Sequence, residues 1–337
     1  MHSCKVQSHP AAHVQPAEYE EQRKRISLGL FPSALLKAQE QVMGKEHAWE
    51  LRYYQREFSL PLSRNIFGLF TIPVYINHVR AVFVVDTGAQ ISGIKSEKIA
   101  QLKLKKTGGK LQIGSIGGTR RDMQGLVADS VQLGGLEVLN MAMIALDSSD
   151  FSLRFGNIDL FGFDGILGWD ILHQLDFELD DVAKQFIVLK NRFRIPYPNM
   201  LKGSFPCFLV KRADQEISLF GFDSGSRVSW IGEQAIQEHA LTVVHEGSAM
   251  GFGVHGLERM DLKIIKQWTL YLDKAEITLK DTMTGRVRLF DDFAFDGVFG
   301  NEIFRKRRIR ILNSANMVLL AYPFSFWRAE SQGTAGV

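Results

Sequence analysis

The sequence is poor in the features that mark several classes of protein. It has only two cysteines, Cys4 and Cys207, which lie far apart and match no metal-binding spacing, so a disulfide scaffold is not expected. No stretch reaches the roughly 18 apolar residues that a membrane helix needs. The net charge of +3 is too small to indicate nucleic acid or an anionic membrane as a partner. We therefore expect a soluble, cytoplasmic chain in a reducing compartment, with neither of these partners.

The N-terminal part also lacks the apolar segment of a signal peptide. Cys4 becomes a candidate for lipid attachment only if an upstream leader has been removed, and this is the less favoured alternative. Residues 1–25 are polar and show little periodicity, so we predict a mobile tail. Between Pro32 and Phe58, apolar residues recur at near-helical spacing, which predicts one or two amphipathic helices. We interpret these as a helical extension on the body of the protein; an inhibitory pro-segment lying in a cleft is the alternative.

Strand patterns replace the helical pattern after this extension. Phe70–Ile76 alternates, Asn77-His78 is a turn signal, and Val79–Val85 is an apolar strand, which together predict a β-hairpin. The second strand runs directly into Asp86-Thr87-Gly88. A buried strand that ends in a carboxylate is costly unless the carboxylate has a task. Asp86 is therefore a candidate functional residue.

The same arrangement returns in the second half of the chain. Strand Ile217–Phe222 runs into Asp223-Ser224-Gly225, 137 positions after the first acid. In both halves a short helix, a glycine-rich hairpin tip and an apolar Asp-Gly run follow in the same order. These landmarks are Ser96–Ala100, Ile116-Gly117-Gly118 and Asp164–Gly168 in the first half, and Gly232–Ile236, Gly253-Val254-His255 and Asp296–Gly300 in the second. The repeat indicates an internal duplication with two β-rich, barrel-like or sandwich-like lobes.

With these motifs, the sequence resembles the aspartic peptidases, in the branch that includes retropepsins and pepsins. The residues that carry the resemblance are Asp86-Thr87-Gly88-Ala89 with Asp164–Gly168, and Asp223-Ser224-Gly225-Ser226 with Asp296–Gly300. It covers about residues 59–325 and implies a mainly β, bilobal aspartic protease fold, made of two pseudo-symmetric lobes fused in a single chain with a helical N-terminal extension. The expected divisions are 1–58 for the tail and extension, 59–195 and 196–325 for the retropepsin-like lobes, and 326–337 for a C-terminal tail. Arg192–Lys202, which contains two prolines, is the predicted linker.

The chemistry of such a pair explains the motif. Peptide hydrolysis needs a base to activate water and an acid to protonate the amide nitrogen, and two adjacent carboxyls that share one proton supply both. Asp86 and Asp223 are therefore the predicted catalytic residues, with no metal and no cofactor. Glycine at positions 88 and 225 lets the backbone pass close to the acids. The resemblance implies that the hydroxyls of Thr87 and Ser224 bond across to the opposite loop.

Neighbouring residues add two further expectations. Asp164 and Asp296 are conceivable rival acids, but their place in the motif favours a structural role in turns.

Ser226 follows the second motif, and its hydroxyl is predicted to bond the adjacent carboxylate and favour its charged form, which Ala89 cannot do. We therefore predict a pair of acids that works at less acidic pH than one flanked by two hydroxyls.

The glycine-rich tips lie where the family carries its flaps, 31 positions past Asp86 at Gly117 and 31 past Asp223 at Val254. The candidate flap and substrate-binding residues are Ile116, Gly117, Gly118, Gly253, Val254 and His255. Two such tips resemble a fused pair of retropepsin subunits. Ordinary hairpins are the alternative, because glycine-rich hairpins are common.

The resulting prediction is a monomeric aspartic endopeptidase that acts on a peptide or protein substrate. The alternative is a catalytically weak or inactive protease-like module that binds peptides as a regulator. Self-cleavage of the first 58 residues is a third possibility. The basic run Arg305–Ile311 is expected to be a solvated strand face and not a nucleic-acid site.

Overall fold

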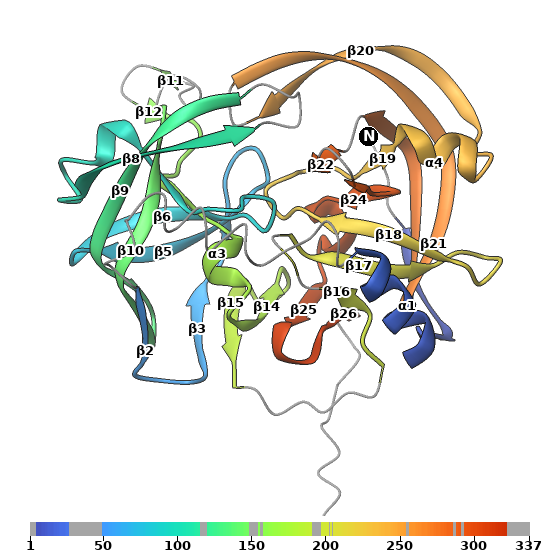
Figure 1. Cartoon of the computed structure of the whole chain (residues 1–337), viewed down its shortest axis with the longest axis horizontal. Helices are drawn as coiled ribbons and strands as arrows, with labels where there is room; N and C mark the ends of the chain where they lie inside the picture. Colours follow the sequence, from blue (N-terminus) through green and yellow to red (C-terminus); the bar gives the residue numbers. More distant parts are fainter. Residues whose placement is uncertain are drawn as a thin grey trace, which may run out of the picture.

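The structure is a computed structural model, and its described part is mainly β. Two large sheets lie side by side, and a third, smaller sheet lies below and between them (Figure 1). No helix within the described ranges has the length and the apolar character of a membrane span. The described residues are 5–26, 49–114, 120–147, 154–155, 158–190, 197–201, 203, 205–253, 256–285, 288–290 and 293–321.

The first sheet holds the predicted hairpin. β5 and β6 have the bounds expected from the sequence, and the turn residues Asn77 and His78 have φ angles of 47° and 69°. Two consecutive positive φ angles match the twist of a tight hairpin, so this prediction is confirmed. The strands of the sheet, in its order, are β2 (Glu50–Tyr53), β10 (Leu136–Leu146), β7 (Gly93–Lys95), β13 (Gly165–Leu167), β6 (Val79–Val85), β5 (Phe70–Ile76), β9 (Arg120–Leu133) and β8 (Lys105–Gly114), with β4 (Ser63–Arg64) beside β5.

The second sheet repeats this plan. β21 folds back on itself as two arms, so it corresponds to β9 and β10 together. The arms are linked by bonds from the Lys263 N–H to Thr284 Oγ1 and between the hydroxyls of Thr269 and Thr278. The arms meet at Asp273, where φ is 52°. In order, the strands are β1 (Lys5–Ala12), β21 (Gly256–Gly285), β19 (Trp230–Gly232), β24 (Gly297–Phe299), β18 (Ile217–Phe222), β17 (Cys207–Lys211) and β16 (Met200–Leu201), with β20 (Val243–Gly253) beside β21.

In both sheets, the strand that leads to the acid pairs in parallel with the glycine strand of the same half. Gly165 of β13 lies opposite Phe83 of β6, and Gly297 of β24 lies opposite Phe220 of β18. A Cβ atom on Gly165 would lie 2.6 Å from the Phe83 ring. The Asp-Gly motifs therefore place glycine where a buried phenylalanine ring packs against the backbone.

The third sheet joins the two halves. Its strands, in order, are β26 (Met317–Ala321), β25 (Arg308–Leu312), β14 (Asp176–Asp180), β15 (Gln185–Leu189) and β3 (Phe58–Pro61). The basic run in β25 is not a freely solvated face. Arg310 Nη2 lies 2.6 Å from the carboxylate of Glu178, and Arg308 Nε lies 3.4 Å from Asp180, both of them buried acids of β14. The prediction of a solvated face fails for Arg308 and Arg310 because the facing strand is acidic, whereas Arg305 and Lys306, which precede β25, are exposed as expected.

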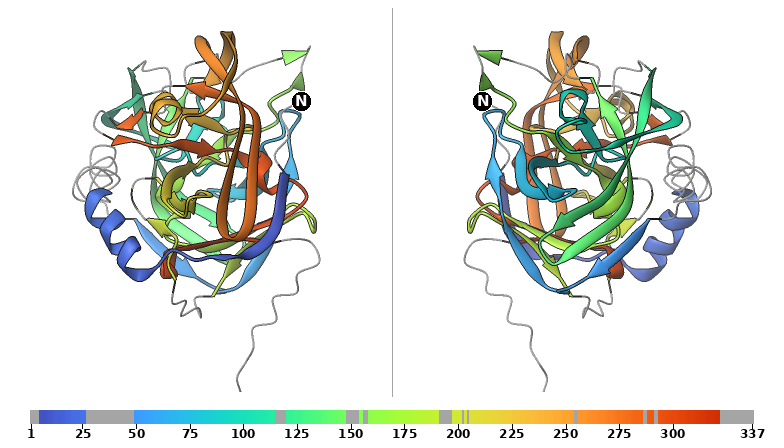
Figure 2. Two further views of the ribbon diagram at one scale, coloured as in Figure 1. Left: turned by 90° about the vertical axis from the view of Figure 1, so that its right-hand side faces the viewer. Right: turned by 90° about the vertical axis from the view of Figure 1, so that its left-hand side faces the viewer.

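The N-terminal predictions need two corrections. Residues expected as a mobile tail form β1, which runs along the edge of β21, and helix α1 (Pro16–Ile26) (Figure 2). Tyr19 of this helix is buried in the second half of the chain. Of the helices expected between Pro32 and Phe58, residues 32–48 lie outside the described part. Glu50–Tyr53 is a strand, because it pairs with β10 and this long-range pairing overrides the local helical spacing.

The remaining elements are short. The helices expected after each acid are present as η1 (Ser96–Lys98) and α4 (Glu233–Glu238). Of the predicted linker, Met200–Leu201 pairs with β17, whereas 192–196 and Lys202 lie outside the described residues, as does the expected C-terminal tail. The other helices and strands are α3 (Trp169–Leu172), η2 (Asn301–Phe304), η3 (Asn313–Ala315), β11 (Arg154–Phe155), β12 (Ile158–Asp159), β22 (Arg288–Phe290) and β23 (Phe293–Ala294).

Candidate active site

The two acid loops meet between the large sheets. Asp86 follows β6 and Asp223 follows β18, and each is fixed at the backbone by the neighbouring glycine strand. The Asp86 N–H donates to the Leu167 carbonyl at 3.0 Å, and the Asp223 N–H donates to the Phe299 carbonyl at 2.9 Å. The same pairing therefore delivers one acid from each half of the chain.

Reciprocal hydrogen bonds tie the loops together. Thr87 Oγ1 donates to the Phe222 carbonyl at 2.7 Å and accepts the Ser224 N–H at 2.9 Å. Ser224 Oγ donates to the Val85 carbonyl at 2.7 Å and accepts the Thr87 N–H at 3.0 Å. Both hydroxyl residues are fully buried, where unpaired polar groups are costly, so the four bonds fix the relative position of the loops. The structure thus shows the cross-loop contacts that the sequence led us to expect.

Each carboxyl receives two backbone donors on one oxygen. Oδ1 of Asp86 accepts the N–H groups of Gly88 and Ala89 at 2.9 and 3.0 Å. Oδ1 of Asp223 accepts those of Gly225 and Ser226 at 2.8 and 3.0 Å. These donors orient the carboxyls and leave Oδ2 of each acid available for other partners.

The two glycines permit this approach. A Cβ atom on Gly88 would lie 2.5 Å from Cγ of Asp223, and one on Gly225 would overlap the carboxyl of Asp86. Either side chain would force the loops apart. The expectation that glycine is needed at both positions agrees with these distances.

The electrostatics of the two acids are coupled. Burial raises the pKa of Asp86, although its loop donors partly oppose the shift. The pKa of Asp223 is raised well above the ordinary range, first by burial and then by the charge of Asp86 and its hydrogen bond with that carboxyl. Two close carboxyls that cannot both ionise retain one proton between them. The pair can therefore present a base and an acid to the same reactant.

Ser226 does not act as expected. Its hydroxyl donates to the Val228 carbonyl at 2.8 Å, and only its backbone N–H reaches Asp223. The predicted hydroxyl bond to the carboxylate is wrong, because a nearby backbone acceptor takes the single proton of the hydroxyl. Ala89 has no hydroxyl, so neither acid gains this bond from the position after its motif. The expected asymmetry at this position disappears, and activity at less acidic pH stays a prediction.

Asp164 and Asp296 have the structural role expected for them. Asp164 Oδ2 accepts the Val82 N–H at 2.9 Å, and Oδ1 lies 2.8 Å from Lys98 Nζ. In the second half, Asp296 Oδ2 accepts the Leu219 N–H at 2.7 Å. Each acid therefore fixes the strand that leads to the candidate catalytic residue of its own half.

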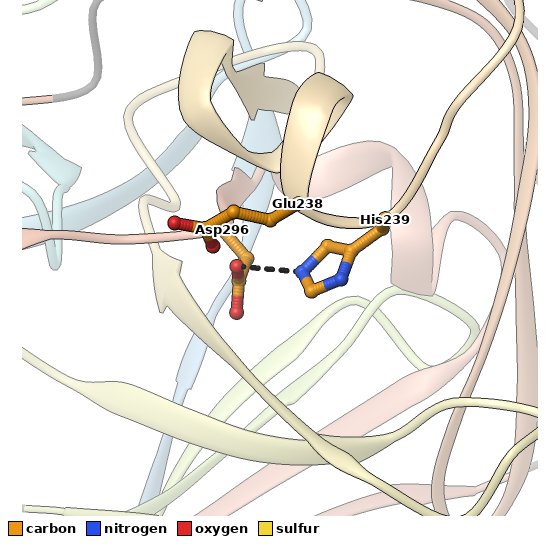
Figure 3. Close-up of side chains that lie close together, drawn as sticks. All are labelled: Glu238, His239 and Asp296. Atoms are coloured by element: carbon orange, nitrogen blue, oxygen red, sulfur yellow. Dashed lines mark hydrogen bonds and ion pairs between the residues drawn. The ribbon is translucent and has the colours of Figure 1, made fainter.

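Asp296 also faces His239, whose Nε2 lies 3.0 Å from Oδ1 (Figure 3). With exposed Glu238, these side chains form a group whose possible metal-ligating atoms lie within 4.8 Å of one another. Both Asp296 oxygens already have protein partners. His239 contacts Asp296 as Lys98 contacts Asp164, although it comes from a different position of its half, so the arrangement is explained by the bonds that Asp296 makes within the protein.

A second pair of buried acids was missed from the sequence. Ser92 Oγ donates to Asp170 Oδ1 at 2.7 Å and accepts the Gly168 N–H at 2.9 Å. In the second half, the Ser229 N–H donates to Glu302 at 2.6 Å, and Ser229 Oγ accepts a backbone N–H at 3.0 Å. The signal was present: a serine stands six positions after each catalytic candidate, and an acid stands two positions after the last glycine of each Asp-Gly run.

Two long pairs of antiparallel strands flank the predicted flap residues in the sequence. Lys105–Gly114 (β8) pairs with Arg120–Leu133 (β9), and Val243–Gly253 (β20) pairs with Gly256–Gly285 (β21) (Figure 1). Gly253 ends β20 and pairs with Gly256. The other candidates, Ile116, Gly117, Gly118, Val254 and His255, lie outside the described residues. Both hairpins are confirmed, and contact with substrate stays a prediction.

One family of known proteins matches part of the chain that includes Asp86. Residues 72–171 match the family described as Aspartyl protease. Among solved structures, the chain is similar to a retropepsin-like aspartic protease from Rickettsia conorii, at 24% identity and a TM-score of 0.26, over 42% of this chain and 94% of that one. Comparison with curated proteins gives no match. Residues 72–171, which include Asp86 and its Asp-Gly run, are therefore similar to the aspartyl protease family.

Proposed function

We propose that the chain is an aspartic endopeptidase in which Asp86 and Asp223 activate the attacking water. The observation that carries this proposal is the meeting of two acid loops from different halves of the chain, joined by reciprocal bonds through Thr87 and Ser224. A structural ion pair would not explain it, because two like charges are brought together without a cation between them in the described residues. One shared proton makes such a pair stable and chemically useful.

The mechanism follows from the unequal carboxyls. The two carboxyls share one proton, and we write the cycle with that proton on Asp223, whose pKa is raised by burial and by the charge of Asp86. Asp86 takes a proton from water as its oxygen attacks the peptide carbonyl carbon, and Asp223 donates its proton to the developing oxyanion. Collapse of the tetrahedral intermediate returns that proton to Asp223 and passes the other from Asp86 to the leaving amine nitrogen. No proton is gained or lost in the cycle.

The finer architecture is part of the proposal. We assign the first and second sheets to the two lobes of a single-chain, bilobal peptidase, with divisions near residues 59, 196 and 326, except that β2 belongs to the first sheet and β1 to the second. Substrate would lie across the acids and beneath the β8–β9 and β20–β21 hairpins, whose tips would act as flaps. A monomer that acts on peptides or proteins, without nucleic acid or membrane partners, and a cytoplasmic location stay predictions.

The decisive experiment is cleavage of a peptide library across pH. Asp86→Asn and Asp223→Asn should each abolish cleavage while leaving the fold intact, because each removes one of the two proton-transfer groups. Asp214→Asn is the matched control, since Asp214 lies in an exposed turn and pairs with Arg212. Full activity in either active-site variant would refute the proposal.

The alternative function is peptide binding without turnover. It predicts that library peptides bind the wild type and that their mass never changes. The half-buried pair of acids favours hydrolysis, since a binding module gains nothing from two adjacent carboxyls that must share a proton. A mass spectrum of the wild type beside Asp223→Asn also tests self-cleavage of the first 58 residues.

A further inference from the structure

The residues that follow the two glycine strands cross from one half of the chain to the other. Trp169 Nε1 donates to the Gly203 carbonyl at 2.9 Å, and Asn301 Nδ2 donates to the Gly68 carbonyl at 3.3 Å. Trp169 and Asn301 occupy matched positions, one residue after Gly168 and Gly300. The two crossing bonds are therefore copies of one contact made with different side chains.

Only the Asn301 side chain also contacts an acid loop. Its Nδ2 lies 3.4 Å from the Ser224 carbonyl, one residue after Asp223, and its backbone N–H donates to the Ser226 carbonyl at 2.8 Å. The Trp169 backbone N–H makes the matching bond to Ala89, at 2.7 Å, but its side chain is used for the crossing bond. Asn301 thus links the loop of Asp223 to the first half of the chain.

Arg64 fixes the orientation of the Asn301 amide. Arg64 Nη1 donates to Asn301 Oδ1 at 3.2 Å and to the Gly68 carbonyl at 2.5 Å. Because the amide oxygen must face this guanidinium, the NH₂ group must face Gly68 and Ser224. The choice of orientation is therefore set by a residue of the first half.

Arg64 is itself held firmly. Its Nε and Nη2 donate to the two carboxylate oxygens of Asp181 at 3.0 and 3.1 Å, and its guanidinium lies 3.8 Å from the centre of the Phe70 ring. Asp181 is buried and also accepts the Lys306 N–H at 2.7 Å. A bidentate pair of this kind fixes both position and orientation. The chain of contacts runs from Asp181 through Arg64 and Asn301 to the carbonyl beside Asp223.

We propose that Asn301, oriented by Arg64, is a positioning residue that sets the separation of the Asp86 and Asp223 carboxyls. The inference rests on the proposed peptidase function only for its kinetic consequences. The reciprocal Thr87 and Ser224 bonds join the loops beneath the acids, and Asn301 adds a contact on the second loop alone. Loss of that contact lets the carboxyls move apart and weakens their coupling.

The coupling has a direct readout. When two carboxyls share a proton, their first and second macroscopic pKa values are driven apart by their interaction, and a larger separation in space brings these values together. An increase of about 1 Å narrows the gap by about half a pKa unit for an effective dielectric constant near 20. Displacement of a catalytic group on this scale also lowers kcat by about 10- to 100-fold.

The test compares Asn301→Ala and Asn301→Asp with the wild type by ¹³C NMR titration of aspartate carboxyls, which needs no turnover. Asn301→Asp is nearly isosteric and can still accept from Arg64, but when ionised it cannot donate to Ser224. We expect both variants to narrow the difference between the two macroscopic pKa values of the Asp86 and Asp223 pair. We also expect both to lower kcat with little change in KM. Because Asn301→Asp keeps the size of the side chain, the same effect in both variants would show that the lost donor, and not lost packing, is the cause. Asn301→Asp also keeps the test valid if Asn301→Ala does not fold.

Trp169→Phe is the matched control, because it removes the other crossing bond without touching an acid loop. We expect it to lower the free energy of unfolding and to leave the gap between the two pKa values unchanged. An unchanged gap in both Asn301 variants, or equal narrowing in Trp169→Phe, would overturn the inference. If the wild type cleaves no peptide, the proposed function fails, while the NMR titration still decides the role of Asn301.

Discussion

Glu302 offers a quantitative test of how the buried acids beneath the loops behave. Asp170, at the matched position, accepts the Ser92 N–H and hydroxyl and the Ile171 N–H. Oε1 of Glu302 accepts the Ser229 N–H, but Oε2 is buried with no hydrogen-bond partner among the described residues. Burial raises the pKa of Glu302 to about 7 from a reference value of 4.5. Glu302 should therefore be largely protonated at mildly acidic pH.

The perturbation is Glu302→Gln, which keeps a carbonyl for the Ser229 N–H and cannot ionise. Because the folded state binds the Glu302 proton more tightly than the unfolded state, its contribution to stability is complete below pH 4.5 and declines as the pH rises to about 7. Since one pKa unit corresponds to 1.36 kcal/mol, the shift of Glu302 corresponds to a loss of about 3 kcal/mol across this window. Glu302→Gln should lack this loss.

The assay is urea unfolding at several pH values between 4.5 and 8. Asp86 and Asp223 also have raised pKa values, so they too lower the free energy of unfolding as the pH rises. Only the difference in unfolding free energy between wild type and Glu302→Gln therefore reports on Glu302. Asp214→Asn, in an exposed turn, should follow the wild-type curve. Parallel curves for wild type and Glu302→Gln would show that Glu302 is charged in the folded protein and would refute the reasoning.

Three further substitutions test the loops and the third sheet. Gly88→Ala places a Cβ atom 2.5 Å from Cγ of Asp223, so peptide cleavage should fall by about 100-fold with the circular dichroism spectrum preserved. Thr87→Val removes the buried hydroxyl that bonds across to the second loop, and thermal unfolding should show a loss of about 2 kcal/mol; an unchanged midpoint would contradict this. Arg310→Met leaves the buried Glu178 with one weaker partner, and urea unfolding should show a loss of about 2 kcal/mol, with Arg310→Lys as the control that retains the charge.

Local signals made part of the fold predictable. Phe70–Ile76 and Val79–Val85 alternate or run apolar on either side of Asn77-His78, so pattern and turn chemistry agree on one hairpin. Asp86 and Asp223 could be found because each stands at the end of such a strand and the whole arrangement is repeated. A motif made of residues that are adjacent in the sequence can be recognised without knowing the fold.

Long-range pairing was not predictable in this way. Glu50–Tyr53 lies in a segment with helical spacing, yet it is a strand because β10 offers it a partner more than 80 positions later. The N-terminal residues Lys5–Ala12 carry no strand pattern, and they add to the second sheet through its β21 edge. The Ser226 hydroxyl illustrates the same limit for side chains, since two acceptors lay within reach and the sequence does not say which is closer.

The duplicated positions differ most where side chains, and not the backbone, make the contacts. Trp169 becomes Asn301 at a matched position, and the side chain that faces the Asp-Gly acid comes from a different position in each half, Lys98 for Asp164 and His239 for Asp296. The backbone bonds beneath the acids are the same in both halves. Two identical halves would give two equivalent carboxyls, and the shared proton would have no preferred site. Unequal surroundings remove that equivalence, since any difference in burial or hydrogen bonding favours the proton on one acid. Divergence between the halves therefore gives a single chain what two identical subunits lack, namely two carboxyls in different surroundings, so that the shared proton can have a preferred site.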